Sequence, residues 1–184
     1  MARILNLIVL ALEMRGLSIS ISDRKWMILI FYTQLSNLAA ALSSLLLVLF
    51  GQPAWVTVFR YLSTCMLIMT FLVTVCVLIP MGGDSKKLLW SGNGLYHHVL
   101  CPILSSCSYL LVENHAERSA IFLPVAVTLI YGLVMLYLNA KNKVDGPYPF
   151  FRVHKQSVAA TVLWMVVLMC VIGGTSLLVW LFGR

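Results

Sequence analysis

The sequence predicts an all-α fold, a polytopic membrane protein built as a six-transmembrane-helix bundle. Its 184 residues are 61% hydrophobic and only 10% charged, whereas soluble domains have roughly 45–50% apolar and ~25% charged residues. The mean hydropathy is +0.95. Six apolar stretches approach the ~20 residues that a helix needs to cross the hydrocarbon core. These observations exclude a soluble enzyme, a disordered chain and a secreted disulfide scaffold.

The six predicted helices form a single integral membrane domain over residues 1–184. The first is the least apolar, because Arg3, Glu13 and Arg15 lie in or beside it. It is not a signal peptide, since no small-x-small cleavage site follows it. The others are more continuous apolar runs. The predicted helices cover residues 3–21, 26–50, 53–80, 92–113, 119–140 and 157–182.

Turn-forming residues separate these helices. Gly and Pro occupy the connection at 51–53, and Pro80 opens the next one with two glycines behind it. A short polar segment at 114–118 divides the fourth helix from the fifth. The longest connection, 141–156, combines Gly and Pro with a run of aromatic residues. Such short loops make consecutive helices antiparallel neighbours.

The basic residues predict the orientation in the membrane. The formal net charge is +7. Nine of the 13 Lys and Arg residues lie in or next to the first, third and fifth loops, and three lie on the opposite side, while Arg60 falls within a helix. The positive-inside rule therefore places loops 1, 3 and 5 in the cytoplasm and both termini outside. Because the charges are dispersed, nucleic acid is not an expected partner.

The cysteines and histidines do not indicate a metal or haem site. The five cysteines are odd in number, form no CxxC pair and lie inside apolar runs, as small core residues do. His97 and His98 are adjacent, so on a helix their side chains point ~100° apart. Haem ligation would need two histidines facing each other from different helices. No cofactor is expected. The cysteines are Cys65, Cys76, Cys101, Cys107 and Cys170.

A hydroxyl and an imidazole are expected at the same depth. Thr33 lies seven residues beyond Trp26, or ~10 Å along a helix, and His98 lies six residues beyond Gly92, or ~9 Å. Both helices start on the same side, so a base can activate a nucleophile there. The structural alternative is that Thr33 bonds its own helix backbone and that His98 makes an interhelical hydrogen bond. Asn37, one turn deeper than Thr33, is a candidate to orient the substrate or donate to an oxyanion.

Two intramembrane charges are expected near the opposite face. Arg60 lies seven residues beyond Pro53, or ~10 Å from that face, and Glu113 ends the fourth helix close to it. Charged side chains within a membrane usually pair, so the sequence predicts an Arg60–Glu113 ion pair. The series Ser36, Ala40, Ser43 and Ser44 suits close helix packing.

Three segments together resemble a known family. Residues 31–38 read Phe-Tyr-Thr-Gln-Leu-Ser-Asn-Leu and resemble its Phe/Tyr-Thr-x-x-Ser-Asn-Leu signature. Residues 95–102, Leu-Tyr-His-His-Val-Leu-Cys-Pro, resemble its His-x-x-x-Pro helix, which ends in an acidic residue. Residues 148–150 resemble its Tyr-Pro-Phe loop. The family is that of the androgen-induced and androgen-dependent multispanning membrane hydrolases, which cleave fatty acid esters of hydroxy fatty acids, together with their prokaryotic six-helix relatives.

This resemblance implies an intramembrane threonine hydrolase acting on lipid esters, with Thr33 as nucleophile and His98 as base. A pattern one residue longer would select His97 instead. The prokaryotic relatives imply a bacterial inner membrane location, with a lipid ester and the surrounding membrane lipids as partners. A non-enzymatic lipid-binding or transport protein is the alternative.

The long loop is expected to cover this site. Pro147 and Pro149 fix two φ angles and remove two hydrogen-bond donors, so Tyr148 and Phe150 cannot lie in a regular helix. Both side chains are too apolar for a free loop. We therefore expect them to fold back over the cytoplasmic mouth and to contact substrate near Thr33 or His98. The alternative is an aromatic anchor at the membrane interface.

Overall fold

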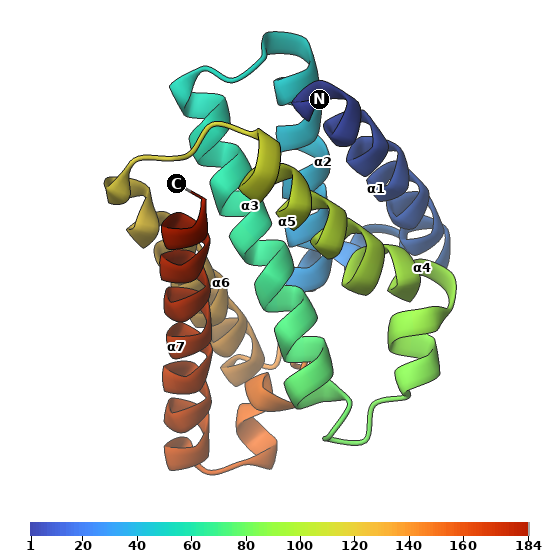
Figure 1. The fold of residues 1–184 in the computed structure, drawn as a ribbon. Helices are drawn as coiled ribbons and strands as arrows, with labels where there is room; N and C mark the ends of the chain where they lie inside the picture. Colours follow the sequence, from blue (N-terminus) through green and yellow to red (C-terminus); the bar gives the residue numbers. More distant parts are fainter. Residues whose placement is uncertain (184) are drawn as a thin grey trace.

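A computed structural model describes residues 1–183, apart from the side chains of Arg24 and Trp26. Within this range the regular secondary structure is entirely helical. The long helices pack as a bundle in which consecutive members run in opposite directions, as predicted (Figure 1). The α-helices are α1 Ala2–Arg24, α2 Tyr32–Phe50, α3 Ala54–Val73, α4 Gly92–Leu95, α5 Cys101–Val112, α6 Phe122–Ala140 and α7 Val158–Phe182.

Helix α3 lies at the centre of the bundle and packs against α2, α5, α6 and α7 (Figure 1). Helix α1 packs on α2 and α5, while α6 and α7 pack on each other at the other side of α3. Six helical segments are long and apolar enough to cross a membrane, as an integral membrane protein requires. They are Ala2–Asp23, Tyr32–Phe50, Ala54–Leu78, Gly92–Val112, Arg118–Ala140 and Val158–Phe182.

The outward faces of these helices are apolar. In α7 the buried residues Leu168, Ile172, Ser176 and Val179 follow helical spacing and define the inner face. Large apolar side chains such as Leu163 point outward and are exposed. An apolar outer surface around a partly polar interior matches a helix bundle that is solvated by lipid.

The second predicted helix, 26–50, is divided in the structure. Residues Lys25–Ile30 form a 3₁₀ segment, Phe31 is extended, and α2 begins only at Tyr32. The hydroxyl of Tyr131 on α6 bridges this break, because it accepts the N–H of Tyr32 at 3.0 Å and donates to the carbonyl of Ile30 at 2.7 Å. Thr33 therefore lies in the first turn of α2 and not two turns inside a helix.

Two other predicted helices contain π-helical turns. Helix α3 continues as the π-helical turn Thr74–Leu78, and the fourth membrane segment consists of α4, the π-helical turn Tyr96–Leu100 and α5. The second π turn lies just before Pro102, which has no N–H to bond the carbonyl of His98 four residues earlier. The N–H of Cys101 instead bonds the carbonyl of Tyr96, five residues back. Such π turns are frequent at functional sites, and this one carries both adjacent histidines.

Candidate functional site

Thr33 lies at the N-terminus of α2, where helical N–H groups lack partners within the helix. The N–H of Thr33 instead donates a hydrogen bond to the hydroxyl oxygen of Tyr148 at 3.2 Å. The same hydroxyl lies 3.1 Å from Thr33 Oγ1. One phenol oxygen thus holds both the backbone and the side chain of Thr33.

Tyr148 reaches Thr33 because the long loop folds back over the bundle, as predicted. The loop turns through the short 3₁₀ segment Pro149–Phe151, and Tyr148 and Phe150 are both buried. Their rings stack with centroids 5.2 Å apart, and the Tyr148 ring also meets Phe31 edge-on at 6.1 Å. This aromatic cluster fixes the Tyr148 hydroxyl over the start of α2.

His98 is buried and bonded to Thr74 at the end of α3. Its Nδ1 lies 2.7 Å from Thr74 Oγ1, and the Thr74 hydroxyl also donates to the carbonyl of Thr70 at 2.8 Å. A hydroxyl has a single proton. When that proton is used in the bond to Thr70, Nδ1 of His98 is the donor to Thr74, and Nε2 keeps a free lone pair. In that tautomer Nε2 is able to accept a proton.

Thr33 and His98 line one cavity of about 360 Å³. Tyr148 and the two prolines beside it form its wall on the side of the long loop. No hydrogen bond joins Thr33 to His98 directly within the described part of the chain, because Thr33 is bonded to Tyr148 and His98 to Thr74. The remaining wall includes Leu78, Gly82, Gly83, Lys87, Leu88 and Asn93.

A second, narrower cavity of about 30 Å³ continues between α2, α3, α6 and α7. Thr33, Leu78 and Tyr148 line both cavities, so Thr33 stands where they adjoin. Phe150, predicted at the mouth, lines only this inner cavity. Its walls are mainly apolar.

The structure separates the two adjacent histidines. His98 lines the outer cavity, whereas His97 is fully buried and lines neither cavity. The Nδ1 atom of His97 lies 3.2 Å from Nε2 of Gln34. Asn37 also lies away from both cavities. Its Nδ2 donates to the carbonyls of Thr33 at 2.6 Å and His97 at 3.5 Å, so it braces the backbone and does not face a substrate.

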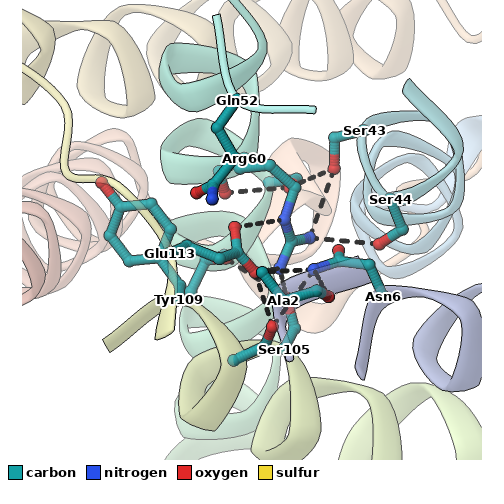
Figure 2. A network of polar contacts seen from close by, with 12 residues as sticks. Ala2, Asn6, Ser43, Ser44, Gln52, Arg60, Ser105, Tyr109 and Glu113 are labelled. Atoms are coloured by element: carbon teal, nitrogen blue, oxygen red, sulfur yellow. Dashed lines mark hydrogen bonds and ion pairs between the residues drawn. The ribbon is translucent and has the colours of Figure 1, made fainter. Parts of the chain in front are cut away.

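The predicted ion pair between Arg60 and Glu113 is confirmed, and both side chains are almost completely buried. Arg60 Nε lies 2.9 Å from Glu113 Oε2, and Nη2 lies 3.0 Å from Oε1. Figure 2 shows the guanidinium lying between the Glu113 carboxylate and the serine side chains that bond it. Ser43, Ser44 and Ser105 accept its other hydrogen bonds, while Asn6 and Ser108 donate to the carboxylate.

The sequence did not indicate most of this network. Ser43 and Ser44 suited close packing by their spacing, yet both accept hydrogen bonds from Arg60. Asn6 bonds Glu113 across 107 positions of the chain, and nothing in the local sequence marks that contact. Thr74 likewise belongs to no recognisable sequence motif. The feature that could have indicated its contact with His98 is that it is a polar residue within an apolar run, at the depth of His98.

Across residues 1–183, no group of three His, Cys, Asp or Glu side chains is placed to hold a metal ion. Comparison of the chain with protein-family models, with curated proteins and with solved structures finds no match.

Proposed function

We propose that the protein is an intramembrane threonine hydrolase that cleaves lipid esters, such as fatty acid esters of hydroxy fatty acids. The observation that supports it best is the shared cavity of about 360 Å³, which both Thr33 and His98 line. The resemblance of the three sequence segments to the membrane hydrolase family supports the same assignment. The nucleophile and the base come from different helices and are each held by a second hydroxyl group.

In this mechanism Thr33 Oγ1 attacks the ester carbonyl carbon while Nε2 of His98 takes its proton. The tetrahedral intermediate then expels the alcohol, which takes that proton from His98, and an acyl group remains on Thr33. Water next attacks the acyl carbonyl, with His98 again acting as base. The products are a free acid and a regenerated Thr33.

Tyr148 has to yield its position for this reaction to occur. Its hydroxyl is within hydrogen-bonding distance of both Oγ1 and the N–H of Thr33, so an ester that approaches Thr33 replaces it. The carbonyl oxygen of the ester then accepts the N–H of Thr33, and the N-terminal end of α2 stabilises the negative charge that develops there. Tyr148 and Phe150 contact the acyl chain in this arrangement.

The substrate enters from the membrane side at which loops 1, 3 and 5 lie. By the distribution of basic residues this is the cytoplasmic side, and we place the protein in a bacterial inner membrane with both termini outside. The ester stays at the polar layer around Thr33, while its acyl chain extends between apolar helix faces. No cofactor takes part.

Turnover of a long-chain p-nitrophenyl ester by the purified protein tests this proposal. Thr33→Ala is expected to abolish nitrophenol release, and Thr33→Ser, which keeps the hydroxyl, is expected to retain part of it. Thr175→Ala is the matched control, because Thr175 is a buried threonine of α7 that lines neither cavity. Equal rates for Thr33→Ala and Thr175→Ala would refute the assignment.

The second candidate function is non-enzymatic lipid binding or transport. The bond between Thr33 and Tyr148 favours it, because a resting contact of this kind also suits a binding pocket closed by a loop. A protein that co-purifies with a stoichiometric lipid and releases it intact, without any ester cleavage, fits this second function and not the first.

A further inference from the structure

The carboxyl group of Glu13, in the middle of α1, has no Lys or Arg within ion-pairing distance among the described residues. Glu13 is fully buried, and among the described residues its carboxyl group has only the weakly polar thiol of Cys101 as a side-chain hydrogen-bond neighbour, with no nitrogen or hydroxyl donor on either oxygen. A buried, unpaired carboxylate is costly in any protein and more so within a membrane segment. Arg60 does not neutralise it, because the guanidinium is bonded to Glu113 through two nitrogens.

The group that faces Glu13 is the imidazole of His97. Its Nε2 lies 4.0 Å from Glu13 Oε2, both side chains are fully buried, and Nε2 has no hydrogen-bond partner. Gly16 makes this approach possible. A Cβ atom at position 16 would clash with His97 Nε2, so only glycine lets the ring rest against α1 one turn beyond Glu13.

The orientation of Gln34 defines which nitrogen of His97 carries the proton. The amide nitrogen of Gln34, a donor, lies 3.2 Å from Nδ1, which therefore accepts. A neutral ring then has its proton on Nε2, the atom that faces Glu13. The carboxyl oxygens of Glu13 and the amide oxygens of Gln34 and Asn37 are all buried acceptors that no nitrogen or hydroxyl donor of the described residues bonds. This layer between α1, α2 and the π turn therefore contains more hydrogen-bond acceptors than donor hydrogens to bond them.

We infer that Glu13 and His97 form an intramembrane proton-binding site that is separate from the cavity of Thr33 and His98. The site holds one proton beyond that of the neutral imidazole, and Nδ1 is occupied as an acceptor, so the proton resides on the Glu13 carboxyl group next to His97. The pair is then uncharged, which removes the cost of a lone carboxylate. The other titratable groups that face it are the thiol of Cys101, the imidazole of His98 and the guanidinium of Arg60.

Infrared difference spectroscopy of the purified, full-length protein tests this site directly. The wild type is expected to show the C=O stretching band of a protonated, buried carboxylic acid at neutral pH, with the downshift in D₂O that such a group gives. Glu13→Gln is expected to remove the band. The other carboxyl groups do not interfere, because Glu113 is paired with Arg60 and the remaining four acidic residues are exposed.

A pair of glycine substitutions tests the contact with His97. Gly16→Ala forces the imidazole away from Glu13 and is expected to shift the carboxyl band, because the neighbouring donor is lost. Gly174→Ala is the matched control, since nothing lies within 4 Å of a Cβ atom at that helical position; it is expected to leave the band unchanged. Circular dichroism shows whether each variant keeps its helix content.

Three outcomes would overturn the inference. The first is a wild-type spectrum without a protonated carboxyl band between about pH 4 and pH 9, a range that spans the ordinary values of carboxyl and imidazole groups. The second is a band that persists in Glu13→Gln. The third is a folded Gly16→Ala protein whose band is identical to that of Gly174→Ala. None of these depends on hydrolase activity, so failure here leaves the proposed function untouched.

Discussion

Each residue of the proposed dyad is held by a hydroxyl group from elsewhere in the chain. Tyr148 bonds the backbone and side chain of Thr33, and Thr74 bonds His98. The hydroxyl groups of Thr74 and Tyr148 have different expected effects on the proposed reaction. Thr74 fixes the imidazole tautomer that leaves Nε2 available, whereas Tyr148 occupies the place that an ester oxygen needs.

Tyr148→Phe is therefore expected to raise kcat/KM. The substitution keeps the ring that stacks on Phe150 and removes only the hydroxyl that competes with substrate. A hydrogen bond of this kind contributes about 0.5–1.5 kcal/mol, which corresponds to a rise of up to about tenfold. Ester hydrolysis measured at low substrate concentration checks this. A loss of more than about tenfold would mean that the hydroxyl takes part in the reaction.

The two histidines are expected to differ sharply in their effects on turnover. His98→Ala removes the base and is expected to lower kcat by about 10²–10⁴-fold, the usual contribution of general acid–base catalysis. His97→Ala is expected to stay close to wild type per folded molecule, because His97 lines neither cavity. Rates normalised to the monodisperse fraction check this pair. The reverse pattern would assign the base to His97.

At the level of elements, the Arg60 network joins four helices around one buried ion pair. Arg60 comes from α3, Glu113 follows α5, and their partners come from α1 and α2 as well (Figure 2). Every polar contact in it is internal to the bundle, and none of its residues lines either cavity. The network therefore stabilises the packing of these helices and does not contribute directly to the proposed chemistry.

Arg60→Ala is expected to destabilise the protein by about 3–5 kcal/mol, because it leaves Glu113 buried without its counter-charge. The double substitution Arg60→Met with Glu113→Leu is the control, since it removes both charges and is expected to recover much of that loss. Denaturant unfolding in detergent measures both variants. An Arg60→Ala protein as stable as wild type but inactive would place Arg60 in the catalytic site.

The elements show which features a sequence can predict. Six apolar runs and their turn residues predict six membrane segments, and charges in apolar runs predict the Arg60–Glu113 pair, because both signals are local. The break before Tyr32 is not predictable in this way. It depends on the Tyr131 hydroxyl, which lies 99 positions further along the chain. The bond between Thr33 and Tyr148 spans 115 positions and is equally invisible to local patterns.

For the whole molecule, the bundle brings the Thr33–His98 cavity towards one end and the Arg60 network towards the other. Consecutive helices alternate in direction (Figure 1), so the first, third and fifth loops share the end that carries the cavity. The excess of basic residues in these loops predicts that this end is cytoplasmic. The bundle thus has the cavity at one end and the buried ion pair towards the other.

A topology reporter at the C-terminus tests this orientation. Alkaline phosphatase fused after residue 184 is expected to be active, because that enzyme needs an oxidising compartment and both termini are predicted to lie outside. Green fluorescent protein fused at the same position is expected to stay dark when exported. A fluorescent fusion together with an inactive phosphatase fusion would reverse the orientation.

The identity of the residue that a nucleophile-directed probe modifies tests the central claim most directly. The purified protein is incubated with a fluorophosphonate probe, digested, and analysed by mass spectrometry to locate the adduct. The account predicts a covalent adduct on Thr33, present in wild type and Thr175→Ala, strongly reduced in His98→Ala and absent from Thr33→Ala. An adduct on any other side chain, or equal labelling of Thr33→Ala, would contradict it.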